Sequence, residues 1–108
     1  MTPEEAYEEA LRRIRVAKET GALELDLSRL ALNRLPQLAG LTSLLSLSFS
    51  RCYQLSGNLS PLAGLTSLQS LNLAACNQLN DALSPLAGLT SLQTLDLSYA
   101  TNSETFPR

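Results

Sequence analysis

Histidine and tryptophan are both absent from this 108-residue sequence. Without histidine, no side chain ordinarily exchanges a proton near neutral pH, and a cysteine nucleophile would lack its usual base. The two cysteines, Cys52 and Cys76, cannot complete a four-ligand zinc site of the cysteine and histidine type. We therefore expect no enzyme activity, no metal site and no cofactor.

Basic residues and long apolar runs are also scarce. Lys and Arg number 8 against 10 Asp and Glu, which gives a formal net charge of -2. Proteins that bind nucleic acid cluster Lys and Arg, and a membrane span needs about 18 apolar residues in a row. We expect neither a nucleic-acid nor a membrane partner. Residues 1–10 are acidic, unlike a secretory signal or a transit peptide, so a cytoplasmic location is expected.

Leucine, in contrast, recurs at fixed intervals. The stretch Leu59–Leu73 returns almost unchanged further along the chain as Leu83–Leu97, and a looser copy begins at Leu38. A fixed period of about 20 to 29 residues with this leucine spacing is the signature of a leucine-rich repeat solenoid. The two close copies differ at only two positions, Ser70/Thr94 and Asn72/Asp96.

Each copy contains a short L-x-L segment that is typical of a strand. Its leucines should point inward and its middle residue outward, and like residues of successive copies should stack about 4.8 Å apart. We predict an α/β fold: a short right-handed leucine-rich repeat solenoid of about four repeats over residues 21–108, ending in an irregular tail. The parallel sheet should form its concave face, with short helical turns starting near Ser60 and Ser84 on the convex side.

A helix is predicted over residues 1–20. Thr2 can act as N-cap, with Pro3 in the first turn and Glu5 completing a capping box, and Gly21 can supply a left-handed C-cap. An open stack of repeats needs a polar cap, so the helix should cover the first repeat; docking on a partner or a membrane surface is the alternative. Its predicted apolar stripe is Tyr7, Ala10, Leu11, Ile14, Val16 and Ala17.

Residues 21–100 resemble the leucine-rich repeat superfamily, and Cys52-Tyr-Gln-Leu55 and Cys76-Asn-Gln-Leu79 resemble its cysteine-containing subtype. The helix and Gly21–Pro36 are similar to the leader and first repeat of bacterial Roco-type proteins, in which repeats precede a Ras-like GTPase. This resemblance implies an interaction and regulatory module. The sequence contains no G-x-x-x-x-G-K-[ST] phosphate loop.

We therefore expect a non-catalytic protein-protein interaction or scaffolding module. The alternative is the regulatory amino-terminal portion of a larger Roco-type GTPase or another multidomain signalling enzyme. Solenoids usually bind on the concave face, and Arg29, Arg51 and Tyr99 at its margin are the best candidates for anchors; the other interpretation is solvated loop-edge residues. The predicted partner-binding residues are Asp26, Arg29, Ser48, Arg51, Asn72, Asp96 and Tyr99.

The leucine pattern stops after Leu97, so the predicted stack has a cap at one end only. An uncovered sheet edge is prone to association. We expect either a homodimer, through end-to-end contact with a second copy, or a tail that folds back through Phe106 as a modest cap. The residues predicted for self-association are Leu86, Leu89, Leu92, Leu95, Leu97 and Phe106, together with Tyr99.

Two further clusters have ordinary explanations. Cys52 and Cys76 lie one period apart, close enough to form a disulfide if stacked, but buried free thiols are the preferred interpretation. Asn77, Asn80 and Asp81 gather in one turn without the spacing of a calcium loop, and turn chemistry accounts for them.

Overall fold

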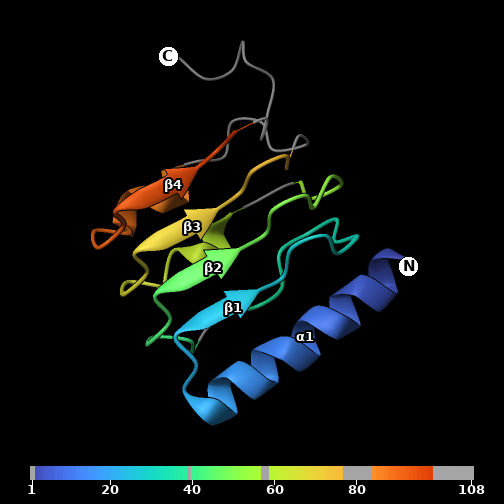
Figure 1. Ribbon diagram of the computed structural model, residues 1–108, viewed down its shortest axis with the longest axis horizontal. Coiled ribbons are helices and arrows are strands. Elements are labelled where there is room, and N and C mark those ends of the chain that lie inside the picture. The colour runs from blue at the N-terminus through green and yellow to red at the C-terminus, as the bar shows by residue number, and fades with distance from the viewer. Residues whose placement is uncertain (1, 39, 57–58, 77–83, 99–108) are drawn as a thin grey trace.

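The computed structural model describes residues 2–38, 40–56, 59–76 and 84–98, which form one α-helix, four parallel strands and two short 3-10 helices (Figure 1). The predicted α/β fold, with an amino-terminal helix and a parallel sheet, is confirmed at this level. The elements are α1 (Pro3–Thr20), β1 (Glu24–Asp26), β2 (Ser46–Ser48), η1 (Ser60–Leu62), β3 (Ser70–Asn72), η2 (Ser84–Gly88) and β4 (Thr94–Asp96).

Both ends of α1 are fixed by the predicted caps. The Thr2 hydroxyl oxygen accepts a hydrogen bond from the Glu5 backbone N–H (3.1 Å), and Glu5 Oε1 accepts one from the Thr2 N–H (2.8 Å). Gly21 takes the left-handed conformation (φ 64°) and donates its N–H to the Ala17 carbonyl. A capping box satisfies two N–H groups that a helix start otherwise leaves unpaired.

The buried face of α1 differs from the predicted stripe. Leu11 and Val16 are 41% and 46% exposed, so their inclusion in the stripe was wrong. Each lies next in sequence to a buried alanine, which is about 100° around the helix axis. The small side chains on the buried face let α1 lie close beside β1 (Figure 1). The buried residues are Ala6, Ala10, Ile14 and Ala17.

One polar contact ties α1 to the outer edge of the sheet. Arg13 Nη1 donates a hydrogen bond to the backbone carbonyl of Asp26 in β1 (3.0 Å), and Glu9 holds Arg13 through an ion pair of 2.7 Å. Asp26 lies in β1, the first strand of the sheet, which pairs with β2 along its other edge. An exposed strand edge offers such groups to any other chain, so Arg13 occupies a position where a further strand would pair.

The sheet aligns the leucine copies in register. Its strand order is β1-β2-β3-β4, all parallel, so each strand pairs with its neighbour in sequence (Figure 1). The register follows the repeat, because Leu25 pairs with Leu47, Leu47 with Leu71 and Leu71 with Leu95. The prediction that like residues of successive copies stack is therefore confirmed, and the register forms two polar columns: Glu24, Ser46, Ser70 and Thr94, and Asp26, Ser48, Asn72 and Asp96.

Leucine side chains fill the space between the sheet and the returning segments. η1 and η2 contact each other behind the sheet, and each has its proline in the first turn, where the missing N–H costs nothing (Figure 1). The buried set includes Phe49, Leu27 and Leu73 at full burial, and it contains no polar or charged residue among those that the structure describes. Hydrophobic burial therefore dominates the stability of this part of the chain.

Candidate binding surface

The central outward column of the sheet uses its side chains to stabilise its own backbone. Each member accepts a hydrogen bond from the N–H two residues further on, which is the Asx-turn or its serine equivalent. The bonds are Asp26 Oδ1 to Ser28 N (2.9 Å), Ser48 Oγ to Ser50 N (3.2 Å), Asn72 Oδ1 to Ala74 N (2.9 Å) and Asp96 Oδ1 to Ser98 N (2.9 Å).

This role was missed when the column was assigned to partner binding, although the residue types carried the signal. Aspartate, asparagine and serine are the residues that form such turns. The exchange of Asn72 for Asp96 between the two copies keeps the accepting oxygen and therefore the bond. Hydrogen bonds from Ser28 lower the pKa of Asp26, and those from Ser98 lower the pKa of Asp96. Both carboxylates are therefore ionised at neutral pH.

Arg29 and Arg51 occupy equivalent positions just beyond the strands. Both have left-handed backbones (φ 64° and 63°), and their N–H groups donate to the Ser50 and Ala74 carbonyls at 2.8 Å. A non-glycine residue in this conformation costs about 1 to 3 kcal/mol and persists only where surrounding structure holds it. The ladder of backbone bonds supplies that support, and both side chains are exposed.

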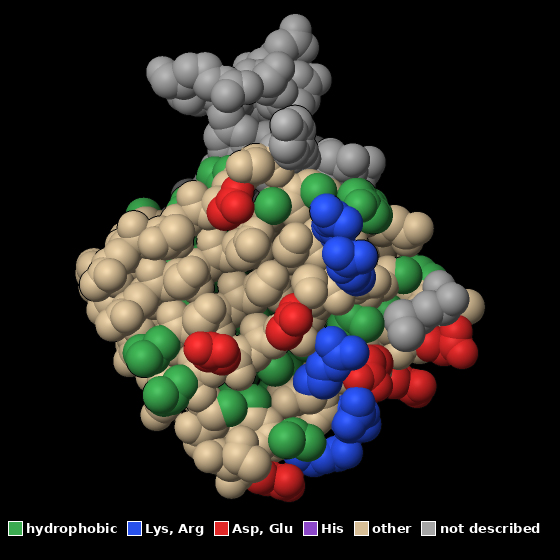
Figure 2. Space-filling model, in the orientation of Figure 1, with side chains coloured by type: hydrophobic (Ala, Val, Ile, Leu, Met, Phe, Trp, Pro, Cys, Tyr) green, Lys and Arg blue, Asp and Glu red, His purple; other side chains and the backbone are tan. Residues whose placement is uncertain are grey.

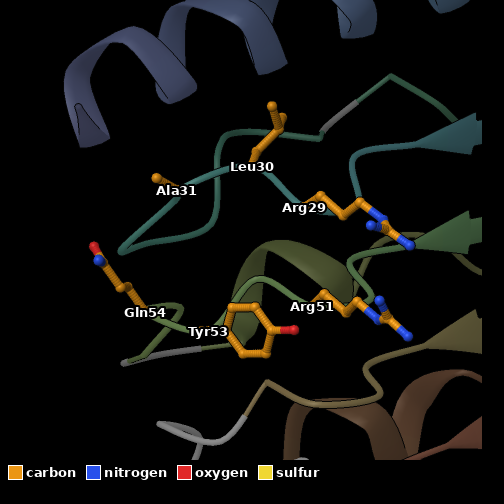
Figure 3. Close-up of a pocket in the computed structure, with 6 residues that line it drawn as sticks. All are labelled: Arg29, Leu30, Ala31, Arg51, Tyr53 and Gln54. Carbon is orange, nitrogen blue, oxygen red and sulfur yellow. The ribbon is translucent and has the colours of Figure 1, made fainter. Parts of the chain in front are cut away.

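These two arginines line a hollow of about 260 Å³ together with Tyr53 and Gln54 (Figure 3). Their guanidinium groups and the Tyr53 hydroxyl point in the same direction (Figure 3). Leu30 and Ala31 complete the lining. Arg29 and Arg51 are thus brought together as predicted, while Tyr99, the third predicted anchor, lies outside the described residues.

Tyr53 was not predicted as part of a site. Its side chain is 53% exposed, which leaves the ring accessible to a partner. Tyr53 follows Cys52, and the equivalent residue one period later is Asn77. An aromatic residue at a position where the copies differ was the feature of the sequence that could have indicated a site.

Lys and Arg side chains (blue) form a broken row along one margin of the sheet face, interrupted by acidic groups (Figure 2). Arg12 and Arg13 are both paired with Glu9, and the Arg34 guanidinium lies 4.2 Å from the centre of the Tyr7 ring. Arg29 and Arg51 lack such partners: within the described ranges, neither side chain has an ion pair or a hydrogen bond.

The residues predicted for self-association differ in exposure. Leu86 and Leu89 are buried, and Leu92 and Leu97 are partly buried. Leu95 in β4 is 39% exposed, and Phe106 lies outside the described residues. The described part of this surface is therefore centred on Leu95.

Both cysteines are buried free thiols, as predicted. Cys52 Sγ donates to the Leu27 carbonyl (3.3 Å), and Cys76 Sγ donates to the Phe49 carbonyl (3.0 Å). Burial raises the pKa of Cys52 to about 12 and that of Cys76 to about 11. The thiolate is the reactive form, so the raised pKa values keep both side chains in the unreactive thiol form at neutral pH.

No three His, Cys, Asp or Glu side chains come together as metal ligands in the described ranges; the predicted turn residues Asn77, Asn80 and Asp81 fall in the gap between residues 76 and 84. Among the described helices, none has the length and apolar character that crossing a membrane requires. No protein-family model matches the chain, and no curated protein gives a significant match.

Proposed function

We propose that the chain is a short right-handed leucine-rich repeat solenoid that binds a protein partner on the exposed face of its sheet and catalyses no reaction. The observation that carries the proposal is the register of the sheet, in which equivalent residues of four successive leucine copies lie side by side. Such stacking presents one continuous surface, and solenoids typically use that surface for binding.

The fixed side chains of the central column favour a binding role. Because Asp26, Asn72 and Asp96 are already bonded to their own backbone, little side-chain freedom remains to be lost when a partner docks. The lowered pKa values of Asp26 and Asp96 also leave these carboxylates poorly suited to transferring protons near neutral pH. A rigid polar surface of this kind suits recognition better than chemistry.

Selection from a displayed library of random, unphosphorylated peptides tests the proposal. We expect enriched peptides whose affinity falls at least about tenfold when both Ser46 and Ser70 on the sheet face are replaced by Lys, because two long charged side chains obstruct the face. Ala63→Lys is the matched control, since Ala63 is exposed beside η1, away from the sheet. Circular dichroism verifies that all variants fold. Failure to enrich any peptide, or equal losses for both variants, would contradict the proposal.

We propose a second role, end-to-end association of two copies of the chain through β4. Leu95 favours it, because an exposed leucine at the sheet edge next to partly buried Leu92 and Leu97 offers an apolar contact. Light scattering across a concentration series should show the mean mass rising for the wild type.

Leu95→Lys should suppress this rise in mass, whereas Leu11→Lys should not. Leu11 on α1 is 41% exposed, close to the exposure of Leu95, so the two leucines differ mainly in their position in the fold. A wild-type protein that stays monomeric at every concentration would rule out the second role.

A further inference from the structure

Arg29 and Arg51 place two positive charges close together in the hollow. The Arg29 N–H donates a hydrogen bond to the carbonyl of Ser50, which directly precedes Arg51, so the two arginines occupy neighbouring turns, about 4.8 Å apart at the backbone. Like charges held side by side repel each other, and each guanidinium carries five N–H donors. With no ion pair or hydrogen bond among the described residues, both groups are available to an added anion.

The charge of Asp26 acts on Arg29. Its carboxylate accepts hydrogen bonds from the Ser28 N–H and hydroxyl, and Arg29 influences it only at longer range. Asp26 therefore offsets part of the charge of Arg29 without occupying its donors. Arg51 lies one turn further from Asp26, and its N–H donates to the carbonyl of Ala74, which carries no charge.

We propose that Arg29, Arg51 and Tyr53 bind a phosphorylated side chain on a protein partner. This deepens the proposed function and rests on it, since the hollow adjoins the sheet face. A carboxylate has two oxygens and is satisfied by one guanidinium fork, whereas a phosphate monoester carries nearly two charges and three acceptor oxygens. A phosphate can therefore bond to both stacked guanidinium groups, and the Tyr53 hydroxyl points the same way as a further donor (Figure 3).

The surroundings favour a single phosphate group over a polyanion. The sheet face next to the arginines carries Glu24, Asp26 and Asp96, and the chain has a formal net charge of -2. A nucleic acid or another extended polyanion would place further phosphates against these carboxylates. One modified side chain reaches the hollow without that repulsion.

Nuclear magnetic resonance titration of the full chain, isotope-labelled and at constant ionic strength, tests the proposal. The probe is N-acetyl-phosphoserine N-methylamide, compared with its unphosphorylated form, its glutamate analogue and inorganic phosphate. We expect saturable shifts at the Arg29 and Arg51 side-chain N–H groups and at Tyr53, with the phosphoserine probe binding tightest. Equal affinity for the glutamate analogue, or for inorganic phosphate alone, would overturn the proposal.

Variants distinguish a specific phosphate-binding site from nonspecific electrostatic attraction of anions. Arg29→Gln and Arg51→Gln should each weaken the probe at least about tenfold, because each removes charge-assisted hydrogen bonds. Arg51→Lys should also weaken it severalfold, because lysine keeps the charge but loses the planar fork. Arg12→Gln removes the same charge from α1 and should change nothing. An equal loss with Arg12→Gln would overturn the proposal.

The two proposals can fail separately. If unphosphorylated peptides bind in a manner sensitive to Ser46 and Ser70 but the phosphoserine probe does not bind, only the phosphate site is wrong. If the probe binds through Arg29 and Arg51 while the sheet-face variants leave peptide binding unchanged, the hollow binds phosphate but the proposed function of the face is wrong.

Discussion

Leu71→Ala is expected to lower the free energy of unfolding by about 2 to 5 kcal/mol, and Leu95→Ala by only about 1 kcal/mol. The two leucines hold the same place in nearly identical stretches and pair with each other in the sheet. Leu71 is 1% exposed and Leu95 is 39% exposed. Removing the Leu71 side chain opens a cavity in the core. The Leu95 side chain is already partly exposed to solvent, so its removal costs less.

Urea denaturation followed by circular dichroism measures both values. The measurements belong at low protein concentration, so that association through β4 does not add to the stability of the wild type or of the Leu71 variant. Equal losses for the two variants would contradict the difference in burial between β3 and β4.

The second large effect concerns alkaline pH. Because burial raises the pKa values of Cys52 and Cys76 to about 12 and about 11, the folded state keeps protons that the unfolded chain releases above about pH 9. The stabilisation is complete below pH 9 and declines as the pH rises. Between pH 9 and 11 the free energy of unfolding should fall by up to about 1.4 kcal/mol per pH unit for each thiol, or about 2.7 kcal/mol per pH unit for both together.

Urea titrations at several pH values between 8 and 11, on the wild type and on a Cys52→Ala, Cys76→Ala double variant, isolate this effect. The double variant retains every other ionisable side chain of the chain, so its slope is the baseline. Identical slopes would show that the thiols ionise freely in the folded state. Alkylation gives an independent check: Cys52 should react about a thousandfold more slowly than an unperturbed thiol at pH 8, in line with its smaller thiolate fraction.

Local rules and the repeat spacing were enough to predict several features. The capping residues Thr2 and Glu5 fix the start of α1, and Gly21 fixes its end, through contacts within a few residues. The constant spacing of the leucine copies predicts the register of β2, β3 and β4, because equivalent leucines must share one core. These features depend on the order of residues along the chain and need no knowledge of distant contacts.

Features that depend on distant neighbours could not be predicted. The stripe on α1 could be recognised, but its edges depend on where β1 meets the helix, which leaves Leu11 exposed. Leu71 and Leu95 have the same local sequence and different burial for a similar reason. Whether an arginine is available for binding depends on which acidic residues lie close to it in the fold. Glu9 forms ion pairs with Arg12 and Arg13, whereas Arg29 has no ion pair among the described residues.

The contact between Arg13 and the Asp26 carbonyl has a consequence for the order of folding. It joins α1 to β1, which follow one another in the chain, so the first packed unit can form before later strands are synthesised. Each later strand then closes a single repeat of chain onto the preceding strand, at a similar entropic cost each time. Short, nearly uniform separations of this kind favour rapid folding that advances from the helix toward β4.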